Sequence, residues 1–487
     1  MIYNRIFLLV LVSLLFIFPA DSFAATAASF RVAPGYVDNV PRQIVRADNN
    51  KLYLFAPVVQ NPGVLKAYWN PAGGFPNSAA DFSGTAQVSN GSSIVSAEAV
   101  YGGGGVIHVF INDMTGTIKD YPFDTSTNTF KAAISVATGA GKPVSYTDIG
   151  TAGISGMFDK TGTLHFTYWT STNQIMYRSY TYNSTTNALN LTSGPTRLDN
   201  SGNANHPQVV VSPLDNSVTA AWVNGTDGAG TMSAKTRSAA GVWGSIEAAS
   251  TGAVWTSPNS GINIDQGPSM VITPNGVKHL IYIENFDGTG DYGKLHYVKN
   301  SGSGWVDTSV TQFYTHAPAI ATNTLSELYV IGHGHPNNPS CTSMLDVCFV
   351  KQNTNGSWTN PSLFTAHPGS DSLDASVSVK WGVAGWNAPE TIEFVFFSAN
   401  NGSYQNTDLW YGRFNSVANA SPSPAISPSP SSLKPGDLDG NNKVDIFDYN
   451  TLLTNFGRTG AGIQGDIDGN GKVDIFDYNI LLTNFGT

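Results

Sequence analysis

The sequence contains few charged residues: Asp, Glu, Lys and Arg together make up 12% of its 487 residues. Long stretches rich in Ala, Glu, Leu and Lys, which favour helices, are absent, whereas Gly is abundant and aromatic residues reach 11%. The net charge is −10 without any basic cluster, which argues against a nucleic-acid partner. This composition is typical of an extracellular all-β protein with many tight turns.

Cysteine is equally scarce, because only Cys341 and Cys348 are present. In an exported chain, two cysteines this close together are expected to form one local disulfide rather than remain two buried thiols. A zinc site would need closer spacing and additional ligands. The pair therefore predicts one local disulfide.

The chain has a single long apolar run, "IFLLVLVSLLFIF" (Ile6 to Phe18), which follows Arg5. A basic residue, an apolar core and the small residues Ser22 and Ala24 are typical of a cleaved secretory signal over residues 1–24. The run is too short to span a bilayer comfortably. We therefore expect a secreted or cell-surface-associated protein that has no transmembrane anchor after signal cleavage.

A second compositional boundary lies near the C-terminus, where "SPSPAISPSPSS" covers residues 421–432. Alternating Ser and Pro cannot form a packed core and favours an extended, semi-rigid spacer. The predicted organisation is a signal peptide (1–24), a large β domain (27–415), a Ser/Pro-rich linker (416–432) and a small C-terminal module (433–487).

The C-terminal module contains one acidic segment twice. "GDLDGNNKVDIFDYNTLLTNFG" starts at Gly436 and "GDIDGNGKVDIFDYNILLTNFG" at Gly465, and the two differ at three positions. Oxygen-bearing side chains recur at positions 1, 3, 5, 9 and 12 of a twelve-residue loop, and position 7 offers its backbone carbonyl, which is a pattern that suits calcium. The predicted ligands are Asp437, Asp439, Asn441, Lys443, Asp445 and Asp448 in the first loop and Asp466, Asp468, Asn470, Lys472, Asp474 and Asp477 in the second.

The charge of this module also favours bound cations. Residues 433–487 carry eight Asp against four Lys and Arg, a net charge of −4 that two calcium ions would cancel. We therefore expect the module to fold with calcium and to lose its structure without it. After each loop, a short amphipathic segment predicts a helix that ends at Gly457 or Gly486.

An Asp at position 12, the lack of a helix before each loop and the tandem arrangement make residues 436–486 resemble a dockerin. Dockerins are small calcium-binding modules that attach secreted polysaccharide-degrading enzymes to cohesin domains on a scaffold. The resemblance implies two bound calcium ions and a cohesin-type partner. It also implies that positions 10 and 11 of each loop face the cohesin: Ile446, Phe447, Ile475 and Phe476. Alternatively, these four residues pack in the module's own core, and the module is a calcium-stiffened cap or adhesion unit.

The large domain contains a recurring apolar strand, which begins near residues 51, 106, 163, 217, 277, 327 and 391. A second strand starts 11 to 19 residues after each of these, and further apolar segments flank several pairs. Each of the seven units supplies four short strands, and a single four-stranded sheet cannot bury both of its faces alone. Sheets that are stacked around an axis bury these faces against their neighbours. The pattern predicts an all-β propeller of seven four-stranded blades. Six blades, or a pair of β-sandwiches, are the alternatives.

The seventh unit ends at Phe414, straight after its third strand. Because a ring has to close, its fourth strand must come from elsewhere in the chain. The segment "SFRVAPGYV" (Ser29 to Val37) is the free candidate. We predict that it forms the outer strand of the last blade.

Turns before Trp243, Trp305 and Trp358 resemble worn Asp-box turns of sialidase-like propellers, and lectin-like propellers are equally compatible. A sialidase-like glycoside hydrolase would need three arginines, a tyrosine nucleophile paired with a glutamate, and an acid. Only Arg42 and Arg46 lie beside a first strand, where a central funnel is expected. The other arginines considered fall mostly on third strands: Arg178, Arg237 and Arg413. The sequence therefore assigns no catalytic residues.

One position within the recurring strand carries polar or aromatic residues in every unit. Its shared register predicts hydrogen bonds between neighbouring blades rather than a catalytic ring. The residues are Tyr53, His108, His165, Thr219, His279, Tyr329 and Glu393. His333 and His335 could hold a metal but fit a surface turn better, and Trp69, Trp255 and Trp386 near loops suit stacking on sugar rings.

Together these features indicate a secreted, carbohydrate-directed protein, which we expect to be a polysaccharide-degrading, glycoside hydrolase-like component docked on a cohesin-bearing scaffold. The alternative is a non-catalytic glycan-binding or adhesion propeller with a calcium-stabilised interaction module. Either function implies an extracellular glycan as ligand.

Overall fold

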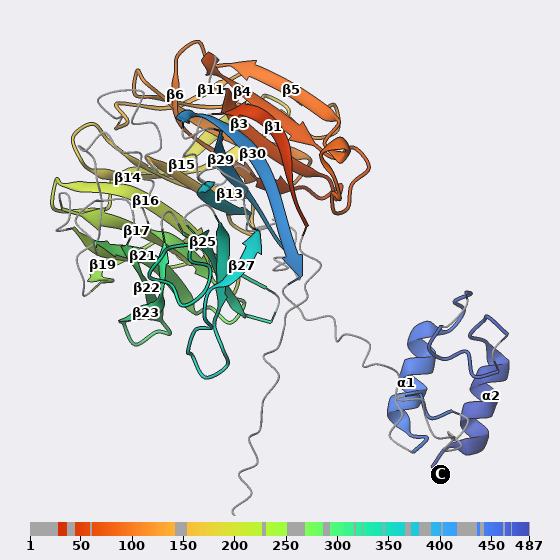
Figure 1. Cartoon of the computed structure of the whole chain (residues 1–487). Coiled ribbons are helices and arrows are strands. Elements are labelled where there is room, and N and C mark those ends of the chain that lie inside the picture. The colour runs from red at the N-terminus through yellow and green to blue at the C-terminus, as the bar shows by residue number, and fades with distance from the viewer. Residues whose placement is uncertain are drawn as a thin grey trace, which may run out of the picture. The chain divides into compact units, whose positions relative to one another are not determined.

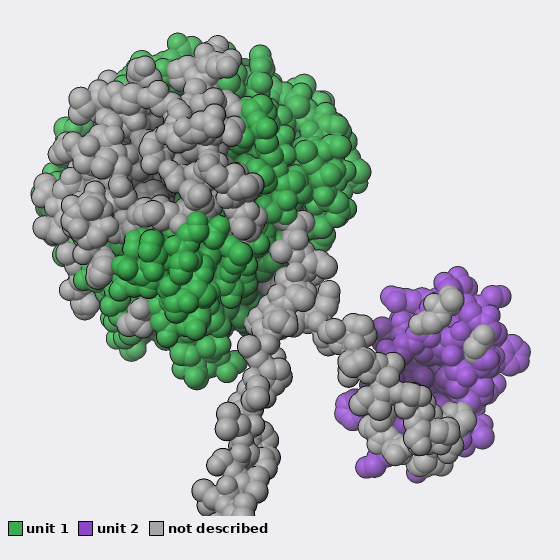
Figure 2. Space-filling model, viewed as in Figure 1, with its two compact units in different colours: residues 1–418 green, residues 419–487 purple. Residues whose placement is uncertain are grey.

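The computed structural model describes residues 28–36, 44–58, 61–141, 153–225, 230–250, 268–285, 293–315, 318–323, 325–343, 346–365, 372–378, 391–400, 403–415, 436–438, 443–460, 463–468 and 470–486. The chain divides into two compact units, Met1–Ala418 and Asn419–Thr487, which Figure 2 colours separately. The predicted signal peptide (1–24) and Ser/Pro-rich linker (416–432) lie outside the described residues.

The described strands of the first unit form a β-propeller with seven four-stranded antiparallel blades (Figure 1). The first strands of the blades are β2 (Ile44–Arg46), β6 (Ile94–Tyr101), β12 (Ile154–Phe158), β16 (Ala204–Val211), β20 (Ser269–Ile272), β24 (Ala319–Thr322) and β28 (Ser372–Ser378). The second strands are β3 (Leu52–Val58), β7 (Val106–Asp113), β13 (Thr163–Trp169), β17 (Val218–Asn224), β21 (Lys278–Asn285), β25 (Leu328–His333) and β29 (Thr391–Asn400).

The third strands are β4 (Asn61–Trp69), β8 (Thr117–Asp120), β14 (Ile175–Asn183), β18 (Thr231–Arg237), β22 (Gly293–Asn300), β26 (Val347–Lys351) and β30 (Ser403–Asn415). The fourth strands are β5 (Gly84–Ser89), β11 (Ile134–Thr138), β15 (Ala188–Arg197), β19 (Trp243–Ala248), β23 (Trp305–Thr315), β27 (Ser362–Thr365) and β1 (Ala28–Tyr36). Three short elements complete the unit: β9 (Phe123–Asp124), β10 (Thr129–Phe130) and the 3-10 helix η1 (Ala79–Asp81). The predicted all-β propeller with seven blades is thereby confirmed.

Burial along each blade explains why the second strand was recognisable in the sequence. The first strands contact one another in a closed ring, so each second strand lies between two neighbouring blades. All eight residues of β7 are buried, whereas half-buried and exposed positions alternate along the outer strand β5. A strand covered on both faces is a continuous apolar run, and a strand at the edge of a blade is not.

The ring closes through the N-terminal strand, as predicted. β1 pairs antiparallel with β30, with Phe30 opposite Tyr411, and Tyr36 at its end also pairs with Val58 of β3. The first and last blades therefore belong to one hydrogen-bonded sheet, and Figure 1 shows β1 and β30 running side by side. The strand begins at Ala28, one residue before the predicted start.

A buried ion pair reinforces the same joint. Arg46 of β2 donates from Nε to Oε2 of Glu393 on β29 at 2.8 Å, and its Nη2 bonds the other carboxylate oxygen. The Tyr411 hydroxyl donates to the same carboxylate at 2.7 Å. Burial and the adjacent Glu393 carboxylate raise the pKa of Tyr411 well above its usual range, which keeps this hydroxyl a donor. Arg46, a candidate for the central funnel, instead ties the first blade to the last.

The second unit contains two short helices, α1 (Ile446–Asn455) and α2 (Ile475–Asn484). Its core consists of four fully buried side chains, two from each half: Val444, Leu452, Val473 and Leu481. The halves bond reciprocally, because Gly457 N donates to Val473 O and Gly486 N donates to Val444 O. Among the described residues of the whole chain, no helix is long and apolar enough to cross a membrane.

We expect Arg46→Ala to destabilise the propeller by about 3 kcal/mol or more, because it leaves the Glu393 carboxylate buried without its cation. Lys131→Ala is the control: Lys131 pairs with Asp124, both side chains are partly exposed at 26% and 22%, and Asp124 also accepts from Ser126, so the loss should cost under about 1 kcal/mol. Thermal and urea unfolding of both variants measure the difference. Equal effects would contradict a special role for the buried pair.

Candidate metal centre and candidate polar site

The second acidic loop gathers three of its predicted ligands. Carboxylate oxygens of Asp466, Asp468 and Asp477 all lie within 4.8 Å of one another, and no other group of three such residues is found in the described part of the chain. Backbone amides wrap around these side chains: Ile467 N donates to Asp477 Oδ1 at 2.6 Å, and Gly471 N donates to Asp466 Oδ2 at 2.9 Å. The loop thus converges its oxygens on one centre.

The first loop shows the same winding where it is described. Leu438 N donates to Asp448 Oδ1 at 2.7 Å, the counterpart of the Ile467–Asp477 bond. Asp448 and Asp477 are both fully buried. Asp437 and Lys443 are also described, whereas Asp439 and Asn441 lie outside the described residues.

Two of the predicted ligands in each loop also begin the following helix. Asp445 and Asp474 are N-cap residues, and their side chains accept from the amides of Phe447 and Phe476 at 2.9 Å. Asp448 and Asp477 occupy the third helical position and complete a capping box with the N-cap amide. An Asp at position 12 therefore closes the loop and starts the helix together.

The four predicted partner-facing residues are exposed, at 51% for Ile446, 65% for Phe447, 53% for Ile475 and 63% for Phe476. They do not belong to the module's core. The alternative that they pack inside the module is therefore wrong. Asn470 is exposed and Lys472 is largely exposed, so the Lys472 side chain points to solvent as its backbone-ligand role requires.

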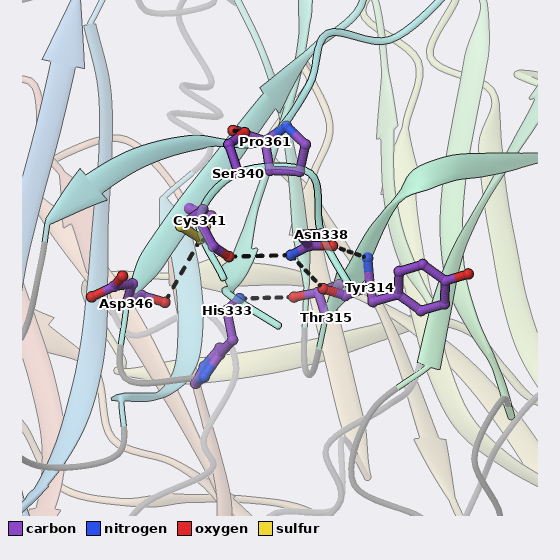
Figure 3. The surroundings of a disulfide bond; sticks show 9 residues. Tyr314, Thr315, His333, Asn338, Ser340, Cys341, Asp346 and Pro361 are labelled. Atoms are coloured by element: carbon purple, nitrogen blue, oxygen red, sulfur yellow. Dashed lines mark hydrogen bonds between the residues drawn. A yellow bond between two sulfur atoms is a disulfide. The ribbon is translucent and has the colours of Figure 1, made fainter. Parts of the chain in front are cut away.

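Cys341 and Cys348 form the predicted disulfide, which joins the connection between β25 and β26 to β26 itself (Figure 3). Asn338 in the same connection bonds the backbone of Tyr314 in the preceding blade, accepting from its amide at 2.7 Å and donating to its carbonyl at 3.1 Å. His335 accepts from Asn337 N through Nδ1, and its ring contacts that of Tyr314. This part of the fold anchors a loop between two blades, and both His333 and His335 are buried rather than at a surface turn.

Several second-strand residues at the shared register bond within their own blade, which corrects the predicted inter-blade role for them. Tyr53 and Glu393 do bond a neighbouring blade, through Asn128 and Arg46, as predicted. His165 Nδ1 and His279 Nδ1 each lie 2.7 Å from a tyrosine hydroxyl of the adjacent third strand, Tyr177 and Tyr297. These two tyrosine rings in turn contact the next blade, where they meet Trp243 and Trp358 edge-on. The other residues at this register are buried likewise: Tyr53, His108, Thr219, Tyr329 and Glu393.

The remaining candidates for sugar chemistry have structural roles where they are described. Arg178 donates to the carbonyl of Val136, and Arg413 to the side chain of Asn77, each in a neighbouring blade. Arg237 lies over the ring of Tyr177 in the preceding blade. Trp69 is buried in the core. Arg42, Trp255 and Trp386 lie outside the described residues.

A polar cluster in the fifth blade escaped the sequence analysis. His296 on β22 lies between two carboxylates: Nδ1 is 2.9 Å from Asp307 Oδ1, and Nε2 is 2.9 Å from Glu284 Oε2. The Tyr282 hydroxyl donates to Asp307 Oδ2 at 2.5 Å. Burial lowers the pKa of His296, but hydrogen bonds and charge from Asp307 and Glu284 outweigh it, so the pKa is raised overall. The spacing of these residues in the sequence did not predict the cluster, because they come from three different strands.

No protein-family model matches the chain, and no curated protein matches it in sequence. Solved structures do match the fold of the chain. One is an ulvan lyase of polysaccharide lyase family PL25, which is 10% identical with a TM-score of 0.51; the alignment covers 80% of this chain and 95% of that chain. The same kind of enzyme bound to -[GlcA(1-4)Rha3S]- is 11% identical, also with a TM-score of 0.51, covering 79% and 95%. At this identity the likeness shows the fold: the large unit shares its propeller with polysaccharide lyases.

We expect the His296 cluster to stabilise the protein most at mildly acidic pH. The pKa of His296 is raised in the folded state, so its contribution is fully present below the unfolded value of about 6.5 and is lost as pH rises through the folded value. The free energy of unfolding of wild type minus that of His296→Gln, measured by urea between pH 5.5 and 9, should therefore shrink with rising pH. A difference that grows with pH would contradict the imidazolium assignment.

Proposed function

We propose that this chain is a secreted, carbohydrate-directed protein: a polysaccharide-degrading component that a calcium-dependent, dockerin-like module attaches to a cohesin-bearing scaffold. The observation that carries the proposal is the convergence of Asp466, Asp468 and Asp477 within 4.8 Å, in a loop that occurs twice. The propeller fold, shared with polysaccharide lyases, supports the carbohydrate-directed part.

The chemistry of the loops fits calcium better than other cations. All side-chain donors are oxygens, from Asp and Asn, and calcium accepts six to eight of these in a flexible arrangement. In the second loop, Asp466, Asp468, Asn470, Asp474 and Asp477 would hold the ion with the backbone carbonyl of Lys472; the matching residues of the first loop would hold another. A bound ion would offset the mutual repulsion of the carboxylates and cross-link the loop to the helix.

The exposed pairs Ile446–Phe447 and Ile475–Phe476 support docking to a protein partner. Large apolar side chains at more than half exposure are costly to leave in water, and each pair stands at the first turn of a helix directly after its loop. Because the two pairs are identical in sequence, the module offers two near-equivalent binding faces.

The two candidate functions of the propeller are degradation of a glycan and binding of a glycan without catalysis. Among the described arginines considered for a sialidase-like clamp, Arg46, Arg178, Arg237 and Arg413 are engaged in contacts between blades, which favours the non-catalytic glycan-binding alternative over sialidase chemistry. Incubation of the full chain with a panel of polysaccharides, followed by assays for reducing ends and for unsaturated sugar products, decides between them. Binding without either product would establish the non-catalytic function.

We expect the full chain to bind two calcium ions and to lose helical circular dichroism signal when calcium is chelated. Asp477→Asn should remove or weaken the second site by at least about tenfold, because it deletes a ligand charge at position 12. Isothermal titration calorimetry measures the stoichiometry. Asp215→Asn, in a propeller turn, is the control and should still bind two ions; a wild type that binds none at millimolar calcium would refute the metal proposal.

We expect Phe447→Ala and Phe476→Ala to have small effects singly and to weaken cohesin binding together by roughly 100-fold or more, because either face suffices alone and each truncated aromatic anchor costs over about 2 kcal/mol. Pull-down and calorimetry against a set of cohesin domains measure this. Val306→Ala, at an exposed propeller residue, should be neutral. Unchanged binding by the double variant would show that the docking face lies elsewhere.

A further inference from the structure

One seam of the propeller contains a chain of charged side chains that reaches from the interior to solvent. Asp307 on β23 is 2% exposed at its side chain, His296 on β22 is 10% exposed, and Glu284 near the end of β21 is 37% exposed. Their contacts are continuous, because the two ring nitrogens of His296 meet one carboxylate each at 2.9 Å. Tyr282 lies against the imidazole, with its ring 4.8 Å away, and bonds Asp307 from the interior side.

The residue pair equivalent to Tyr282 and His296 is uncharged in the third and fourth blades. Strand register pairs Tyr282 with His296 in the fifth blade, Trp222 with Ser233 in the fourth, and Tyr168 with Met176 in the third. In the fourth blade the position two residues after the aromatic is Asn224, which accepts from Trp222 Nε1 at 2.8 Å and donates to Ser233. The third and fourth blades therefore complete this position with neutral groups, whereas the first and second blades place Lys66 and Lys119 at the third-strand partner.

A charged network at this depth is costly, but the propeller also buries Arg46 with Glu393 and His108 with Asp120, so depth alone does not set the fifth-blade network apart. Its distinguishing feature is the exposed end: no side chain of those two pairs is more than 7% exposed, whereas Glu284 is 37% exposed. Burial of a carboxylate such as Asp307 carries a desolvation penalty that paired charges only offset, and neutral replacements often stabilise a protein equally well. What the network does achieve is orientation: with both ring N–H groups bonded to carboxylates, the imidazolium holds Glu284 in one position through a charge-assisted hydrogen bond. The rigidly held group is the one that reaches solvent.

The surroundings of Glu284 suit a sugar. Lys294 lies directly across from it in the pairing of β21 with β22, so both side chains leave the sheet on one side. A sugar hydroxyl both donates and accepts hydrogen bonds, and a fixed carboxylate next to an ammonium group satisfies both requirements. Counting Asp307 and Glu284 against His296 and Lys294, the local charges balance, so the site does not repel neutral or acidic sugars.

We propose that Glu284 is a glycan-contacting residue of the propeller, with its carboxylate accepting hydrogen bonds from sugar hydroxyls beside Lys294, and that His296, Asp307 and Tyr282 are the residues that position it. This inference rests on the proposed carbohydrate-directed function and assigns it to a place, the seam between the fourth and fifth blades. Tyr282 faces the fourth blade there, in the same apolar cluster as Val209 and Met232.

The test uses the full chain in calcium and a panel of pectin, alginate, xylan and laminarin oligosaccharides, with affinity measured by calorimetry on the member bound best. We expect Glu284→Gln to lower that affinity on the order of tenfold to a hundredfold, since it removes a charged acceptor. Glu327→Gln is the matched control: Glu327 is a partly exposed glutamate paired with Lys351 in the next blade, and its replacement should leave affinity unchanged.

The positioning role has its own readout. Wild-type affinity should fall as pH rises and His296 loses its proton, whereas the affinity of His296→Gln should be lower at pH 6 and independent of pH up to 9. Circular dichroism confirms that each variant is folded. If wild type binds and Glu284→Gln binds equally well, this inference is wrong while the proposed function stands; if wild type binds no member of the panel, the proposed function itself fails and the assignment with it.

Discussion

The pairing of β1 with β30 is the interaction on which the rest of the propeller depends. Each blade buries its faces only against its neighbours, so an open ring would leave the first and last blades with apolar faces in water and β30 with an unpaired edge. β1 comes from the other end of the domain and satisfies both requirements, covering the edge of β30 and bonding onward to β3. The Arg46–Glu393 pair and the Phe30–Tyr411 contact then hold the joint from inside.

Within that closed ring the blades share one arrangement of strands but differ in the side chains that pack between them. Second strands supply the continuous apolar layer, and a His–Tyr pair with a Trp from the next blade recurs in the third and fifth blades, where it fixes the spacing of neighbours. Because these elements suffice for packing, a departure from them is informative. The Glu284–His296–Asp307 chain is such a departure, because it connects a buried carboxylate to one that is 37% exposed.

The sequence predicted those features that depend on local spacing. Continuous burial made the second strands visible as apolar runs, and elimination identified the closing strand because one blade lacked its fourth. The convergence of Asp466, Asp468 and Asp477 could be anticipated because the predicted ligands follow one another within twelve residues. The fifth-blade cluster could not, since Glu284, His296 and Asp307 meet only through the pairing of three strands. The predicted inter-blade hydrogen bonds of second-strand residues such as His165 and His279 were wrong for a similar reason. Register shows which face of the sheet a residue lies on, but the residue opposite it on the third strand decides whether its hydrogen bond stays within the blade.

The small unit shows why its sequence is repeated. Four fully buried side chains form too small a core to fold a segment of this size unaided, and each half contributes two of them. Gly436 and Gly465 approach the opposite helix so closely that an added Cβ would lie 3.1 Å from the Cα of Leu481 and 3.5 Å from that of Leu452. Neither half can therefore fold without the other. Asp445, Asp448 and their counterparts both belong to the loops and cap the helices that carry Phe447 and Phe476. An ion held by the loops would therefore determine whether the proposed docking faces form.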